Sequence, residues 1–203
     1  MKKNGYVLRQ ERTREKILEG AQSVFLEMGF KDATVTQIAK QAGVGYGSVY
    51  VHFPSGKEDV FLTIMETVMT EFYSVAEISY TPRTVEEAIR FTTGNIQNYL
   101  ELAIKYKTWV AIFYEAIGQS IAVRKKWEQI SDKFIGRISK NVDKVKELGL
   151  AQNPEYDSKI IAGTLYYPGE HFLWEIALGH ETKDYRSIAE NIAQLYNYGL
   201  YKR

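Results

Sequence analysis

Four glycines crowd the stretch AGVGYGSVYVHFPSGKE, residues 42–58, at positions 43, 45, 47 and 56. Closely spaced glycines either cradle a phosphate or form a turn. A dinucleotide-binding loop requires G-x-G-x-x-G between a strand and a full-length helix. Here the spacing is G-x-G-x-G, it follows a segment of helical periodicity, and no G-x-x-x-x-G-K-[ST] pattern occurs in the chain. We therefore interpret the run as a turn between two short helices.

His171 and Glu175 are the other residues whose types and spacing could support chemistry. Four residues apart on a helix, they share one face, which suits a metal site or an acid–base pair. The chain has no cysteine and no second such pair. We expect the two to share a hydrogen bond, with no metal, cofactor or catalytic residue. A small helical enzyme using them as base and acid stays an alternative, which loss of turnover in His171→Ala would support.

The composition is that of an ordinary globular protein: 203 residues, 45% hydrophobic and 25% charged. No apolar run approaches the ~18 residues of a membrane-spanning helix. The N-terminus is charged, without the apolar core of a signal peptide. We expect a cytoplasmic protein with no membrane partner. Residues 1–16 carry six basic and two acidic side chains, a net charge of +4, which suits a solubilising tail or a nucleic-acid-binding arm.

Nearly the whole chain has helical periodicity, so the predicted fold is all-α with about nine helices. Start and stop signals support this interpretation: three capping boxes, two stop glycines, Asn153 before Pro154, and Asp184. The boxes are Thr34/Gln37, Ser55/Glu58 and Thr84/Glu87, and the stops are Gly29 and Gly43. Helices are expected over 17–28, 35–42, 46–53, 57–75, 85–103, 109–117, 127–145, 154–179 and 185–199.

The two short helices around the glycine turn fit a helix-turn-helix unit. Val49 and Phe53 face inward on the second helix, which leaves an outward surface of Tyr46, Gly47, Ser48, Tyr50 and Val51. Such a helix fits the ~12 Å major groove of DNA. Any helical bundle contains paired helices, so this pattern alone leaves a purely structural role open.

The segment TVTQIAKQAGVGYGSVYVHFPSGKEDVF, residues 34–61, resembles the N-terminal signature of the TetR family of bacterial transcriptional regulators. The resemblance covers about residues 10–65. It implies a DNA-binding domain, which we place at 1–56, and a ligand-binding and dimerisation domain at 57–203, linked by the helix that starts at 57. It also implies a homodimeric repressor that binds a palindromic double-stranded DNA operator and is released by a small-molecule effector.

The resemblance assigns DNA contacts to eight positions: Thr34, Thr36, Tyr46, Gly47, Ser48, Tyr50, His52 and Lys57. Lys57 matches a phosphate-contacting lysine, which would explain a cation at a helix start, where the dipole disfavours it. Two departures matter. Gly45 lacks a hydroxyl that many members carry, and Gly56 inserts a residue before Lys57. We therefore expect Tyr46 to be the main reader of the operator.

Aromatic residues are frequent after residue 95, and most of them belong to the core of a helical body. Pro168-Gly169 stands in mid-helix, where proline costs ~3 kcal/mol and often marks a cavity. The residues expected near a ligand pocket are Tyr99, Trp109, Phe113, Tyr166, Tyr167, His171 and Trp174. Those expected at a dimer interface are Ile161, Leu165, Phe172, Ile176, Ile188, Ile192, Leu195 and Tyr196.

The charge of the effector stays open at this point. Glu115, Glu170 and Glu175 would counter a cationic ligand if they lined the pocket, whereas a pocket without them favours a neutral apolar or aromatic ligand. A regulator that binds DNA with no small-molecule effector is a second alternative.

Overall fold

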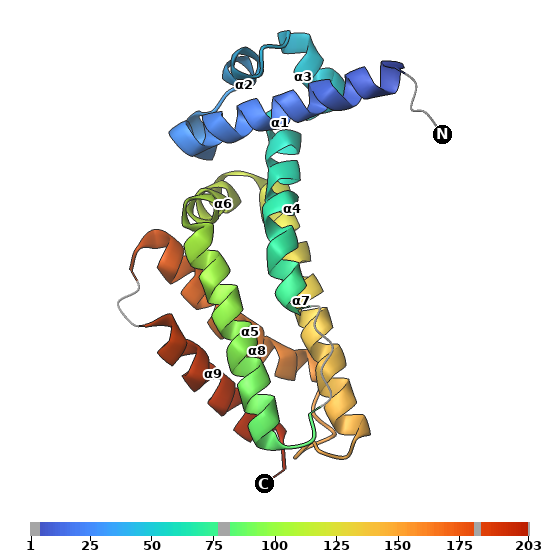
Figure 1. Ribbon diagram of the computed structural model, residues 1–203, viewed down its shortest axis with the longest axis vertical. Helices are drawn as coiled ribbons and strands as arrows, with labels where there is room; N and C mark the ends of the chain where they lie inside the picture. The colour runs from blue at the N-terminus through green and yellow to red at the C-terminus, as the bar shows by residue number, and fades with distance from the viewer. Residues whose placement is uncertain (1–4, 77–81, 181–183, 203) are drawn as a thin grey trace. The chain divides into compact units, whose positions relative to one another are not determined.

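The computed structural model describes residues 5–76, 82–180 and 184–202, and the regular structure within these ranges is helical. The prediction of an all-α fold with about nine helices is confirmed (Figure 1). The helices are α1 (Gly5–Asp32), α2 (Val35–Ala42), α3 (Tyr46–His52), α4 (Lys57–Ala76), α5 (Val85–Lys105), α6 (Lys107–Gln119), α7 (Ile121–Glu147), α8 (Ser158–Leu178) and α9 (Tyr185–Leu200).

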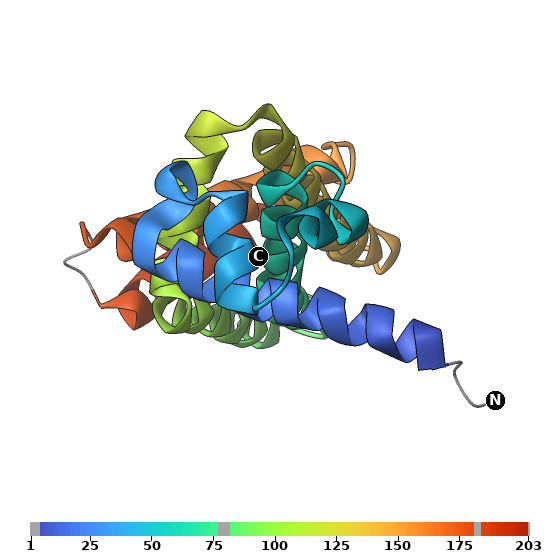
Figure 2. The ribbon, with the colours of Figure 1, turned by 90° about the horizontal axis from the view of Figure 1, so that it is seen from above.

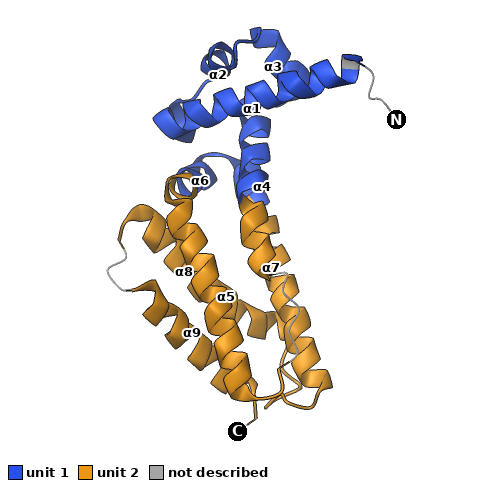
Figure 3. Ribbon diagram, in the orientation of Figure 1, with its two compact units in different colours: residues 1–68, 112–126 blue, residues 69–111, 127–203 orange. Residues whose placement is uncertain are grey.

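The chain divides into two compact units (Figure 3). Unit 1 comprises residues 1–68 and 112–126, and unit 2 comprises residues 69–111 and 127–203. Helices α4, α6 and α7 therefore contribute residues to both units. The predicted boundary between residues 56 and 57 concerns which residues bind DNA, and it stays a prediction.

In unit 1, α1 packs against α2, and α2 against α3 (Figure 2). Helix α1 begins at Gly5, well before the expected start, so part of the basic segment is helical. Gly29 interrupts the regular helix with φ 73° and ψ −176°, which agrees with the stop predicted there. Gly20 lies inside α1, where glycine is disfavoured unless a close contact requires it. A Cβ on it would lie 2.7 Å from the backbone nitrogen of Ala42, so the glycine permits the close contact between α1 and α2.

The predicted signals at α2 and α9 are confirmed, whereas the box predicted at α5 forms only in part, because the Glu87 carboxylate accepts from Arg83 N instead of Thr84 N. The capping box at α2 forms, because Gln37 N donates to Thr34 Oγ1 and Thr34 N donates to Gln37 Oε1. Gly43 ends α2 with φ 63°. Thr84 and Asp184 cap the starts of α5 and α9.

One predicted capping box and one predicted helix start are wrong. Ser55 N donates to the Asp59 carboxylate and Glu58 accepts from Ser120, so the expected Ser55/Glu58 box does not form. Helix α8 begins at Ser158 rather than after Asn153-Pro154. The reason is the Asp157 carboxylate, which accepts hydrogen bonds from the backbone N–H groups of Lys159 and Ile160 and so caps the helix there.

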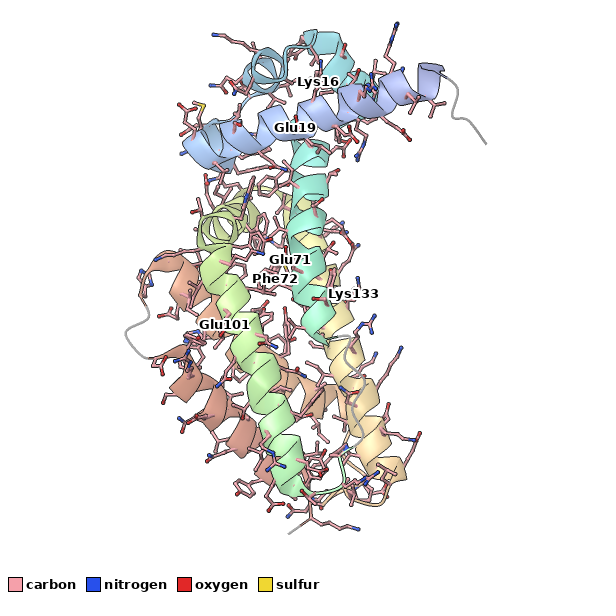
Figure 4. The ribbon with its side chains drawn as sticks, in the orientation of Figure 1. Lys16, Glu19, Glu71, Phe72, Glu101 and Lys133 are labelled. Carbon is pink, nitrogen blue, oxygen red and sulfur yellow. The ribbon has the colours of Figure 1, made fainter. Side chains whose placement is uncertain are left out.

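Each unit has its own core. In unit 1 an aromatic cluster joins Phe25, Phe30, Phe61 and Phe113, with ring centroids 4.7–6.2 Å apart. In unit 2, α5 packs against both α8 and α9. Phe72, at the α4 side of that unit (labelled in Figure 4), contacts the ring of Tyr99 on α5. Helix α8 continues through Pro168.

Candidate nucleic-acid interface and cavity

The outer face of α3 presents a pair of tyrosines. Tyr46 is 55% exposed, and its hydroxyl lies 3.2 Å from that of Tyr50, within hydrogen-bond distance. The ring centroids are 5.3 Å apart. The hydrogen bond with Tyr46 raises the pKa of the Tyr50 hydroxyl. The pair thus presents neutral hydroxyls that can donate to or accept from a partner.

Gly56 packs closely against the ring of Tyr50, a contact that the sequence alone does not predict. It has φ 63°, and a Cβ there would lie 3.1 Å from Tyr50 Cε1 and 3.2 Å from Val35 Cγ2. The family pattern indicates Gly56 only as an inserted residue that shifts Lys57. In the structure, a glycine is needed at this position both for the backbone conformation and for the Tyr50 ring above it.

The other residues predicted to contact DNA differ in accessibility. Thr36 and Gly47 are exposed, Ser48 and His52 are half-buried, and the Thr34 hydroxyl is occupied in the cap of α2. On α1, a shallow groove is lined by Arg9, Arg12 and Lys16 together with Gly5, Leu8 and Thr13 (Lys16 is labelled in Figure 4). The groove thus gathers three of the four basic side chains in the described part of the N-terminal segment on one face of the helix, and the fourth, Arg14, lies over the ring of Phe53.

Lys57 is placed differently from what a phosphate contact requires. Its ammonium donates to the carbonyl oxygens of Phe30, Lys31 and Ala33 at 2.8, 3.1 and 2.9 Å. An ammonium group has three protons, so all of them are used inside unit 1. Burial lowers the pKa of Lys57, and the nearby carboxylate of Glu115 opposes that shift. In this conformation the lysine stabilises the end of α1, and this accounts for a cation at the start of α4.

Glu115 on α6 holds the same segment through its N–H groups. Its Oε2 accepts from Phe30 N and its Oε1 accepts from Lys31 N, both at 3.1 Å. A Cβ on Gly29 would lie 2.7 Å from Glu115 Oε2. We call Gly29–Ala33, with Lys57 on its carbonyls and Glu115 on its N–H groups, the clamped segment.

Unit 2 contains a partly open cavity of about 80 Å³. Its lining is almost wholly apolar: Phe72, Val75 and Ala76 of α4, Asn95, Ile96 and Tyr99 of α5, Phe134 and Ile138 of α7, and Leu165, Tyr166 and Gly169 of α8. Gly169 follows Pro168 directly, so a cavity does lie beside the proline, as its position in the sequence suggests. None of the lining residues is charged.

Two tyrosines of this cavity have contrasting surroundings. The Tyr166 hydroxyl lies 2.9 Å from Ser131 Oγ and donates to Glu170 Oε1 at 3.1 Å. The Tyr99 hydroxyl is buried and has no hydrogen-bond partner among the described residues. Burial raises the pKa of both hydroxyls. An unpaired buried hydroxyl costs ~1–3 kcal/mol, so the position of Tyr99 calls for an explanation.

Of the seven residues predicted near a pocket, Tyr99 and Tyr166 line this cavity. Phe113 belongs to the aromatic core of unit 1, and Trp174 packs on Trp127 with centroids 4.6 Å apart. Tyr167 and His171 are exposed, and Trp109 is half-buried outside the lining. Helical periodicity predicts which residues lie on the same face of α8, but it does not predict which face packs inward.

The residues predicted at a dimer interface are mostly inward-facing. Ile176, Ile188 and Ile192 are buried within unit 2, and Ile161, Leu165, Phe172 and Tyr196 are half-buried. Leu165 lines the cavity. Leu195, by contrast, is 79% exposed, and Ile160 on α8 is 72% exposed. Both line an open groove of about 570 Å³ between the start of α8 and the end of α9.

The three glutamates considered for a cationic ligand lie outside the cavity lining. Glu115 holds the clamped segment, and Glu170 accepts hydrogen bonds from Trp127, Ser131 and Tyr166. Glu175 lies 3.9 Å from His180 Nδ1, and the hydrogen bond expected between His171 and Glu175 does not form. Among the described residues, no group of three or more metal-ligating side chains occurs.

Residues 17–64 match the family described as "Bacterial regulatory proteins, tetR family". Residues 17–64 therefore belong to this family's DNA-binding region. The matched range contains α2, α3 and the tyrosine pair, so the helix-turn-helix interpretation of the glycine turn is confirmed. The matched relatives are transcriptional regulators.

Among relatives, the chain is 29% identical to the HTH-type transcriptional regulator SrpR of Pseudomonas putida over 129 residues. These residues make up 63% of this chain and 58% of SrpR, so the chain spans little more than half of that relative.

Two solved structures have the same fold. A complex of SmeT with triclosan is similar with a TM-score of 0.71 at 20% identity, covering 94% of this chain and 92% of SmeT. NalD of Pseudomonas aeruginosa, described as the secondary repressor of the MexAB-OprM multidrug efflux pump, has a TM-score of 0.69 at 22% identity, covering 95% and 97%. The TetR-like fold therefore extends over both units. No helix among the described residues is long and apolar enough to cross a membrane.

Proposed function

We propose that this protein is a homodimeric transcriptional repressor that binds a palindromic operator in the cytoplasm and is released by a small neutral effector. The observation that carries the DNA-binding part is the exposed Tyr46–Tyr50 pair on α3, with Gly56 packed against Tyr50. Family membership supports the same reading.

Phosphate contacts are assigned to α1 rather than to Lys57. Arg9, Arg12 and Lys16 share one face, and the Lys57 ammonium is occupied by three carbonyl groups. Side chains that neutralise phosphates release counterions, which makes binding strongly salt-dependent. The tyrosine hydroxyls and Thr36 then contact base edges or the sugar-phosphate backbone.

The effector part rests on the cavity of unit 2. Its lining carries no charged group, which favours a neutral ligand. The presence of the cavity argues against the effector-independent alternative, for which a filled body is expected. The structure of SmeT with triclosan, a protein of the same fold, supports a small-molecule site in a body of this kind.

The dimer part rests on the open groove between α8 and α9. Large apolar side chains that are exposed in a single chain mark an interaction surface. We place Ile160 and Leu195 at the centre of a two-fold contact between copies. Ile160→Glu should yield a monomer in light scattering after size exclusion. Ile121→Glu is the matched control, because Ile121 is equally exposed, at 71%, at the start of α7.

The experiment for the whole proposal is binding to the DNA upstream of the protein's own gene, followed by fluorescence anisotropy. Affinity should fall steeply between 50 and 200 mM salt, by roughly 10³-fold if about six phosphates are contacted. Tyr46→Ala should weaken binding about tenfold or more. Tyr114→Ala, a tyrosine of similar exposure (50%) on α6, should leave it unchanged. Equal effects of the two substitutions, or no binding at low salt, would sink the assignment.

A further inference from the structure

The Tyr99 hydroxyl is a fully buried polar group that has no partner among the described residues, and Tyr99 lines the cavity. The Tyr166 hydroxyl is occupied by Ser131 and Glu170, and the remaining polar side chain on the lining is Asn95. Phenylalanine would fill the position of Tyr99 without burying an unpaired donor. A ligand that displaces lining side chains as it enters would give this buried, unsatisfied donor a partner, which makes it a candidate recognition group.

We propose that Tyr99 donates a hydrogen bond to the effector, which is therefore a small neutral molecule with one carbonyl, ether or hydroxyl oxygen on an apolar body. This inference rests on the proposed function, since it takes the cavity as the effector site. The oxygen lies at the Tyr99 end, and the apolar part lies against Phe72, Ile96 and Ile138.

The size of the cavity limits the effector. At about 80 Å³ it is smaller than the roughly 150 Å³ engineered cavity that binds benzene. A molecule of one ring therefore has to displace lining side chains as it enters. A charged ligand is disfavoured, because no lining residue offers a compensating charge.

The test uses two probes of nearly the same shape, cyclopentanone and methylenecyclopentane, which differ in one oxygen acceptor. Each is titrated into the full chain while the methyl signals of Ile96 and Ile138 are followed by NMR, with Ile38 of unit 1 as an internal reference. The same titrations are run with Tyr99→Phe, which removes the hydroxyl and keeps the ring. Comparing the two proteins with each probe cancels the greater hydrophobicity of the hydrocarbon.

Tyr99→Phe should weaken cyclopentanone binding about five- to tenfold, the value of one hydrogen bond, and should not weaken methylenecyclopentane binding. Equal changes for the two probes would overturn the proposal, because the hydroxyl would then not recognise the oxygen. Absence of shifts at Ile96 and Ile138 with either probe would also overturn it. DNA takes no part in these titrations, so failure here is separate from failure of operator binding.

Discussion

Polar groups in the clamped segment of unit 1 and in the cavity of unit 2 have opposite surroundings. In the clamped segment, Lys57 occupies three carbonyl groups and Glu115 occupies two N–H groups. In the cavity, the Tyr99 hydroxyl has no partner among the described residues.

The difference separates a structural site from a recognition site. A polar network whose members are all satisfied fixes one geometry, and losing any member leaves the others unpaired. A single unsatisfied buried donor destabilises the fold and gains a partner only when a ligand arrives. Substitutions in the clamped segment should therefore lower stability, whereas removing the Tyr99 hydroxyl should not.

Lys57→Met should have the largest effect, a loss of about 2–4 kcal/mol in the free energy of unfolding measured with urea. Methionine keeps the length of the side chain but leaves three carbonyl groups without their donor and Glu115 without a neighbouring cation. Lys40→Met, at an exposed position of α2, is the control and should change stability by no more than about 0.5 kcal/mol. Similar losses in the two variants would contradict the clamp.

Gly29→Ala should cost about 1–3 kcal/mol. Its φ of 73° and ψ of −176° lie in a region that is essentially restricted to glycine, and the added Cβ would meet Glu115 Oε2 at 2.7 Å. Gly136→Ala is the matched control, because that glycine is inside α7 with open space around it and alanine favours the helix. Thermal unfolding should show the first variant destabilised and the second unchanged or stabilised. A stabilised Gly29→Ala would show that the backbone at Gly29 is not strained for other residues.

The sequence predicted a cavity beside Pro168 but did not predict the clamped segment. Local signals predict some helix ends, since a capping box such as Thr34/Gln37 is formed by residues three apart, although they fail at the start of α8. They also identify the tyrosine surface of α3. They do not reveal that Lys57 reaches residues 24–27 positions earlier, or that Glu115 reaches Phe30 across 85 positions. Such contacts depend on how the helices pack. The phosphate contact predicted for Lys57 rests on the family pattern alone, which does not include this packing.

Helix α8 shows the same limit for unit 2. Apolar residues occur on more than one of its stripes, so periodicity does not decide between the cavity and the outer surface. Leu165, predicted at the dimer interface, lines the cavity, whereas Tyr167, predicted at the pocket, is 57% exposed. On α9, Ile192 and Leu195 are three residues apart, yet the first is buried and the second exposed. What each stripe faces is settled by tertiary packing and not by its composition.

Glu115→Gln should have a smaller effect than the two substitutions above, about 1 kcal/mol, because glutamine keeps one acceptor oxygen of the two. The loss should be local. Amide hydrogen exchange should accelerate at Phe30 and Lys31 more than in the rest of α1. Glu19→Gln, at an exposed position of the same helix, should leave these two amides unchanged. A uniform acceleration along α1 would mean that Glu115 supports the unit in general rather than this segment.

The two tyrosines of the cavity should show the smallest changes in stability, and they differ in the fewest respects. Tyr166→Phe removes a hydroxyl that is bonded to Ser131 and Glu170, and should cost about 1 kcal/mol. Tyr99→Phe removes one that is bonded to neither side chain nor backbone among the described residues, and should leave stability unchanged or raise it by up to about 1 kcal/mol. Both substitutions keep the ring and lie on the same cavity, so burial of apolar surface is matched between them. Urea unfolding of the two variants without added ligand measures the difference directly. If Tyr99→Phe costs as much as Tyr166→Phe, the Tyr99 hydroxyl has a structural partner, and its assignment to ligand recognition loses its physical basis.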